Sequence, residues 1–115
     1  MNFFLKMILS SVAVIIVSYL LPGVYVEDFF AAFFLAIVLS ILNGLVKPIL
    51  IVFTIPLTFF TLGLFLLVIN AIIILMADGL VPGFEVDGFW WALIFSILLS
   101  ITNSMLSDLS KSKEK

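Results

Sequence analysis

The chain has 115 residues, of which 65% are apolar and only 10% are charged, and its mean hydropathy is +1.46. A soluble domain is about 45–50% apolar and about 25% charged, so this composition excludes a water-soluble fold, and the length allows one domain. The absence of Cys and His excludes disulfides, thiol nucleophiles and metal sites built from those residues. A net charge of −2 argues against nucleic acid as a partner.

Four segments are long and apolar enough to cross a bilayer, which requires about 20 residues each. They cover residues 3–21, 29–46, 58–77 and 89–106, and short connectors with Pro, Gly and acidic residues separate them. We therefore expect an all-α integral membrane protein with four transmembrane helices. A single domain over residues 1–107 is followed by a short polar cytoplasmic tail at 108–115.

The apolar stretch at residues 48–56 does not fit a four-helix pattern simply. Pro56 removes a helical hydrogen bond and clashes with the preceding turn, whereas Pro48 is tolerated in a first turn. We interpret Pro48–Ile55 as a short interfacial or re-entrant helix between the second and third spans. The alternative is one long, tilted and kinked helix from Pro48 to Ala77.

The lysines predict how the chain is oriented in the membrane. In a four-span arrangement all of the lysines lie on one side, and every charged residue of the opposite loops is acidic. The lysines are Lys6, Lys47, Lys111, Lys113 and Lys115; the acidic loop residues are Glu27, Asp28, Asp78, Glu85 and Asp87. Because Lys and Arg favour the cytoplasmic side, both termini are predicted to be cytoplasmic.

The sequence matches itself when it is shifted by 60 residues. Eleven of the 24 positions from Leu20 to Asn43 recur between Leu80 and Asn103, including both residues of a Pro-Gly pair. Apolar bias alone would not place Pro-Gly, Ser and Asn in register. The chain is thus predicted to contain two parallel helix–PG loop–helix repeats, related by a pseudo-twofold axis along the membrane normal.

Small residues recur at every fourth position on the second and fourth helices, where they would form one face. They are Ala32, Ala36, Ser40 and Gly44 on one helix and Ala92, Ser96, Ser100 and Ser104 on the other. We call these two sets the small-residue stripes. Such faces let helices approach closely in lipid, so they are expected to form a packing seam or an oligomer interface. A wet pore wall is a further interpretation.

Three asparagines are the other polar residues of note. Asn70 lies inside the third span and is expected to bond to another helix, with a conduction or gating role as the alternative. Asn43 and Asn103 lie at the cytoplasmic ends of the second and fourth helices, where capping is expected. No catalytic constellation is present and no span contains a central charge, so we expect neither an enzyme nor a cofactor or metal site.

Several short motifs, in this order, resemble the four-transmembrane phage holin family, superfamily IV. They are 43–48 (NGLVKP), 56–58 (PLT), 61–65 (TLGLF), 68–71 (VINA), 81–84 (VPGF) and 88–90 (GFW). The resemblance extends over nearly the whole chain from the first Pro-Gly onward. It implies a four-helix protein of the bacterial cytoplasmic membrane that assembles into homo-oligomers and opens lesions in the lipid bilayer.

The uncharged spans and repeated packing faces fit a second function equally well. In that alternative the chain is a structural or envelope-stress protein that binds other membrane proteins and opens no hole. A minimal transporter is the weakest interpretation, because the four spans contain no embedded charge.

Overall fold

The structure is a computed structural model that describes residues 2–114, with side chains described for residues 2–109. The elements in chain order are α1 (Phe3–Leu20), β1 (Val24–Val26), α2 (Phe29–Ile41), the π-helical segment η1 (Leu42–Val46), α3 (Lys47–Phe53), α4 (Ile55–Phe60), α5 (Phe65–Leu80), β2 (Phe84–Val86) and α6 (Phe89–Glu114). The fold is mostly helical, as expected.

Two helices begin at residues whose side chains cap the first turn. The Leu5 amide donates a hydrogen bond to Asn2 Oδ1 at 2.8 Å, and the Ala31 amide donates to Asp28 Oδ1 at 2.9 Å. These bonds satisfy amides that have no partner within the helix. The caps fix where α1 and α2 start, and Pro22 follows the C-cap residue of α1, Leu21.

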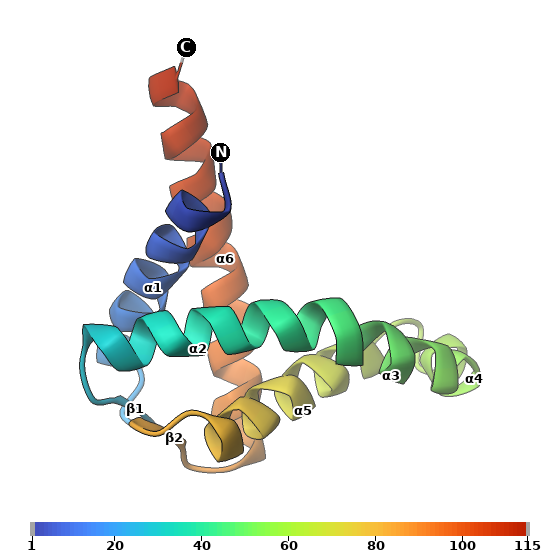
Figure 1. Ribbon diagram of the computed structural model, residues 1–115. Helices are drawn as coiled ribbons and strands as arrows, with labels where there is room; N and C mark the ends of the chain where they lie inside the picture. The colour runs from blue at the N-terminus through green and yellow to red at the C-terminus, as the bar shows by residue number, and fades with distance from the viewer. Residues whose placement is uncertain (1, 115) are drawn as a thin grey trace.

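The two Pro-Gly connectors meet at one corner of the molecule, where β1 and β2 form an antiparallel pair (Figure 1). Val24 faces Val86, Tyr25 faces Glu85 and Val26 faces Phe84. Two further backbone bonds flank this ladder. The Glu27 amide donates to the Gly83 carbonyl at 2.8 Å, and the Asp87 amide donates to the Gly23 carbonyl at 2.8 Å. We call this region the corner; the sequence analysis did not predict its strands.

Two pairs of helices diverge from the corner. α1 packs beside α6 as one pair, and α2 contacts α5 in the other, while α1–α2 and α5–α6 contacts join the pairs near the corner. Figure 1 shows α2 and α3 running away from α1 and α6, and it places the start of α1 and the end of α6 on the same side. We call the α1–α6 pair and the α2–α5 pair the two arms. The arms separate with distance from the corner.

The core lies where the four long helices converge. Val14, Leu35, Ile73 and Phe95 are almost completely buried there. The Phe84 and Phe95 rings pack with centroids 5.5 Å apart, so β2 is anchored on α6. These apolar side chains form the core. Within lipid, close packing rather than exclusion of water must hold the helices together.

The second helix is longer than expected, because α2, η1 and α3 form one continuous helical run over Phe29–Phe53. Within η1 the Lys47 amide donates to the carbonyl of Leu42, five residues earlier. This local widening lets the helix pass Pro48, which has no amide hydrogen to donate. Residues 48–53 therefore extend the second helix, and the segment is not joined to the third span.

The third long helix, α5, starts at Phe65 rather than near residue 58. The chain turns at Thr54, before Pro56 in the first turn of α4, and turns again at Leu62 and Gly63. Leu62 and Gly63 have φ values of 57° and 91°, which no right-handed helix accommodates. The alternative of one long helix from Pro48 to Ala77 is therefore not what the structure has.

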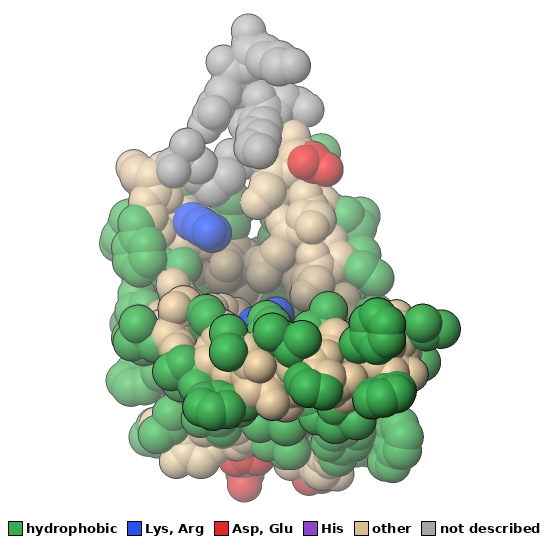
Figure 2. All heavy atoms as spheres, turned by 90° about the vertical axis from the view of Figure 1, so that its right-hand side faces the viewer, with side chains coloured by type: hydrophobic (Ala, Val, Ile, Leu, Met, Phe, Trp, Pro, Cys, Tyr) green, Lys and Arg blue, Asp and Glu red, His purple; other side chains and the backbone are tan. Residues whose placement is uncertain are grey.

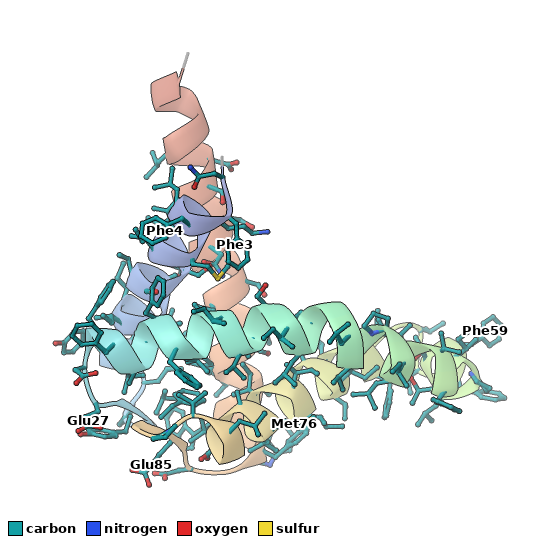
Figure 3. The ribbon with its side chains drawn as sticks, viewed as in Figure 1. Phe3, Phe4, Glu27, Phe59, Met76 and Glu85 are labelled. Atoms are coloured by element: carbon teal, nitrogen blue, oxygen red, sulfur yellow. The ribbon has the colours of Figure 1, made fainter. Side chains whose placement is uncertain are left out.

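Within the described residues, three helical runs are long and apolar enough to cross a membrane: Phe3–Leu20, Phe29–Phe53 and Phe89–Leu109. α5 is apolar but has only 16 residues. α6 continues to Glu114, so residues 108–114 of the expected tail prolong this helix. Large apolar side chains cover the outside of the arms, including Phe59, which points outward from α4 (Figure 3).

Candidate functional site: a polar cleft between the helix arms

A cleft of about 410 Å³ opens between the diverging arms. Side chains from all four long helices and from η1 and α3 line it. The polar or small lining residues are Lys6, Ser10, Ala36, Ser40, Asn43, Gly44, Lys47, Asn70, Ser96, Ser100 and Asn103; the apolar ones are Met7, Val14, Leu39, Ile73, Ile74 and Leu99. The volume lies within the range of about 300–1,000 Å³ that is usual for ligand sites.

The two halves of the chain contribute lining residues from positions that are 60 apart. The pairs are Ser10 and Asn70, Val14 and Ile74, Ala36 and Ser96, Leu39 and Leu99, Ser40 and Ser100, and Asn43 and Asn103. The cleft is therefore lined by corresponding faces of both halves. Asn70, Asn43, Asn103 and the small-residue positions among these pairs were singled out from the sequence, but Ser10 was not.

The cleft has an apolar base and a polar mouth. Val14, Leu39, Ile74 and Leu99 are buried where the cleft meets the core. Towards the open side the lining changes to hydroxyl, amide and ammonium groups, with Lys47 half-buried and Lys6 exposed. A polar group buried in an apolar surrounding is costly, so this mouth is suited to water or to a polar ligand.

The charges are separated along the molecule. Among residues with described side chains, both lysines line the cleft and no acidic residue does. Figure 2 shows basic side chains around a hollow in one face, acidic side chains at the lower end of the molecule and further acidic atoms near its upper end. At the corner, Glu27 and Glu85 point outward (Figure 3). Asp108, on α6, does not line the cleft.

Two of the acidic residues make structural hydrogen bonds at the corner. Asp28 caps α2, and Asp78 Oδ2 accepts a hydrogen bond from the Val86 amide at 3.1 Å. The second bond ties the end of α5 to β2. These contacts give Asp28 and Asp78 local structural roles at the corner.

The small-residue stripes run from the core into the cleft. Ala32, Ala36, Ala92 and Ser96 are buried, and the Ser96 hydroxyl donates to the Leu93 carbonyl at 2.8 Å. Further along, Ser40, Gly44 and Ser100 line the cleft, whereas Ser104 is exposed outside its lining. One half of each stripe thus packs within the chain, and the other half leaves the arms apart.

All three asparagines singled out from the sequence line the cleft. Asn70 and Asn103 are half-buried and Asn43 is exposed. Within residues 2–109 none of these three side-chain amides forms a hydrogen bond to another protein group. Their donors and acceptors therefore face the cleft without a protein partner.

Sequence reasoning did not assign Lys6 and Lys47 to this site. Both were interpreted through membrane orientation, and Lys47 also as an anchor to anionic headgroups of the inner leaflet. Nothing in their spacing of 41 residues indicates proximity to one cavity. Only the packing of α1 against α6 and the extension of α2 through α3 bring them to the same cleft.

Apolar helices that enclose a one-sided polar cleft define a small helical membrane protein. Residues 1–105 match the family described as mycobacterial 4 TMS phage holin, superfamily IV, and the chain belongs to this family. The expected resemblance is thereby confirmed.

Two bacterial relatives are similar over most of their length. An uncharacterized membrane protein, YvlD, of Bacillus subtilis is 36% identical over 102 residues, covering 88% of this chain and 86% of the relative. An uncharacterized protein of Streptomyces coelicolor is 36% identical over 116 residues, covering 92% and 93% of the two chains. No solved structure matches the chain significantly.

Proposed function

We propose that this protein is a four-span protein of the bacterial cytoplasmic membrane that self-associates and permeabilises the bilayer in the manner of a holin. The polar cleft is the observation that supports this function most directly. A surface of hydroxyl, amide and ammonium groups between apolar helices is what a membrane lesion needs, because its wall must meet water on one side and lipid on the other.

In this proposal the cleft opens toward the cytoplasm and the corner faces the outside. The distribution of charge in the helix connectors supports this orientation, since Lys6 and Lys47 lie at the cleft and the acidic residues of the two Pro-Gly connectors lie at the corner. α5 would be the third of the four spans. Its 16 residues extend about 24 Å, so α4 and the turn at Leu62 would complete the crossing near the cytoplasmic interface.

The proposal includes a duplicated hairpin. Three kinds of observation support it: matching flanking hydrogen bonds from Glu27 and Asp87, matching buried positions such as Ala32 and Ala92, and cleft positions 60 residues apart. The two halves would then be related by a pseudo-twofold axis through the corner and the cleft.

Self-association would use the part of the stripes that is not buried within the chain. Gly44 and Ser100 at the cleft, with Ser104 beside it, are small enough for another helix to approach. Copies joined through these positions would place their clefts around a shared aqueous path. The buried residues Ala32, Ala36, Ala92 and Ser96 would serve packing inside each copy.

Co-expression with a cytoplasmic murein-degrading enzyme tests this function. We expect abrupt lysis and entry of a membrane-impermeant dye only when both proteins are present. Gly44→Leu should delay or abolish lysis, whereas Gly79→Leu should not, because an added Cβ at either glycine meets no atom within 4 Å but only Gly44 lines the cleft. Continued growth with intact membranes would contradict the proposal.

A second candidate is a structural or envelope protein that binds other membrane proteins without opening a hole. The observation that favours it is the closed corner, where the β1–β2 ladder and the buried core end the cleft within one copy. In that case the lysis experiment gives no dye entry. Crosslinking in intact cells would then give hetero-complexes in place of homo-oligomers.

A further inference from the structure

The cleft combines positive charge with a lining that, among residues 2–109, contains no carboxylate. Lys6 and Lys47 approach it from two different helices, and the acidic residues of the corner lie at the far end of the molecule. Two ammonium groups at one mouth, of which Lys47 is half-buried, give it a positive potential that attracts an anion. The composition of the lining therefore selects for an anionic ligand.

Neutral hydrogen-bond donors surround the same mouth. The side-chain amides of Asn43 and Asn103 have no partner within the described part of the chain, and the hydroxyl of Ser100 is exposed to the cleft. Amides, hydroxyls and ammonium groups all donate to oxygen, and charge-assisted bonds to phosphate oxygens are the strongest of this kind. This set of donors fits a phosphate better than a neutral solute. It does not fit a cation, which would need carboxylate ligands.

The base of the cleft distinguishes a lipid from a soluble anion. Val14, Leu39 and Leu99 present buried apolar surface directly beneath the polar mouth. An inorganic phosphate gains nothing from this surface, whereas the glycerol and proximal acyl carbons of a phospholipid would bury apolar area against it. The arms around the cleft also expose large apolar side chains, as expected for helices bounded by acyl chains.

We propose that the cleft binds the phosphate headgroup of an anionic phospholipid. Lys6 and Lys47 supply the charge, Asn43 and Asn103 donate hydrogen bonds, and the apolar base receives the glycerol end of the chains. This binding rests on the proposed orientation of the cleft toward the cytoplasmic leaflet, where anionic lipids attract basic residues. It does not depend on hole formation.

Titration of the purified full-length protein in a neutral detergent tests the site. The probes are dioctanoyl phosphatidylglycerol, dioctanoyl phosphatidylcholine, glycerol 3-phosphate and inorganic phosphate. We expect phosphatidylglycerol to bind about tenfold or more tightly than phosphatidylcholine, because two lysines act on its net negative charge. The two soluble phosphates should not compete at the same concentration. Competition at equal concentration would replace the lipid by a soluble anion and overturn the proposal.

Two matched pairs of variants separate the cleft from general surface charge. The double variant Lys6→Gln with Lys47→Gln should lose the preference for phosphatidylglycerol. Lys111→Gln with Lys113→Gln removes the same charge from the last residues of the chain and should change binding less than about twofold. Equal loss in both pairs, or no loss in the first, would refute the site.

The second pair alters the shape of the cleft without changing charge. Gly44→Leu fills the mouth and should weaken phosphatidylglycerol binding about tenfold, whereas Gly79→Leu should leave it unchanged. This pair remains decisive if the lysine variant does not fold, and unchanged binding by Gly44→Leu would overturn the proposal. The readout is lipid affinity, so a negative lysis experiment leaves this test unaffected.

Discussion

Gly23 packs directly against the indole ring of Trp91, so closely that a methyl group at position 23 would overlap the ring. The contact joins the first Pro-Gly connector to the start of α6. Trp91 is consequently half-buried, unlike its exposed neighbour Trp90, and it acts as a packing residue at the corner.

Gly23→Ala is expected to destabilise the fold by about 1–3 kcal/mol, because the ring and the backbone cannot both keep their positions. Thermal unfolding of the detergent-solubilised protein measures this loss. Gly79→Ala is the matched control, since an added Cβ there meets no atom within 4 Å and Ala favours the helix. Similar melting temperatures for both variants would contradict the packing at Gly23.

Asp78 should contribute to stability through its hydrogen bond with the Val86 amide. Asp78→Ala leaves that amide without its partner and is expected to cost about 1–2 kcal/mol. Asp78→Asn keeps an acceptor oxygen and should retain most of the stability. Chemical denaturation in detergent compares the two variants, and Asp108→Ala, which removes a carboxylate outside the corner, is the control. Equal losses for Ala and Asn at position 78 would point to charge instead of this bond.

The two halves of the small-residue stripes should respond differently to enlargement. Ala92 is fully buried, so Ala92→Leu is expected to lower the melting temperature of the single copy. Ser104 is exposed, and Ser104→Leu should leave that temperature unchanged while reducing chemical crosslinking between copies in membranes. If Ser104→Leu does not affect crosslinking, the exposed part of the stripe is not the oligomer contact.

Single-cysteine labelling measures the orientation directly, since the native chain has no Cys. A membrane-impermeant maleimide is expected to label Glu85→Cys in intact spheroplasts. Lys47→Cys should react only after the membrane is opened. Labelling of position 47 from outside would reverse the proposed topology.

The sequence predicted the features that depend on local composition and on repetition. Uninterrupted apolar runs specified the helices that start at Phe3, Phe29 and Phe89, because length and hydropathy suffice for that inference. The Pro-Gly pairs correctly predicted the connectors that follow α1 and α5, since neither Pro nor Gly favours the continuation of a helix.

Other features depend on contacts that are distant in sequence. The strands β1 and β2 have three residues each and exist because each pairs with the other, 60 residues away. The course of the chain past Pro48 depends on the widened helical turn at Leu42–Val46. No residue pattern predicts this turn. The cleft could not be located because nothing local indicates that the small-residue stripes separate at Ser40, Gly44 and Ser100.

The register of the ladder has a consequence for how such a chain could arise. Tyr25 faces Glu85, its counterpart after 60 residues, so the pairing is symmetric about that position. Two separate copies of one hairpin would form the same ladder by an isologous contact, each strand meeting its own twin. A gene of half this length would therefore already encode every backbone group of the β1–β2 ladder. Fusion of two such genes would add only the linker through α4.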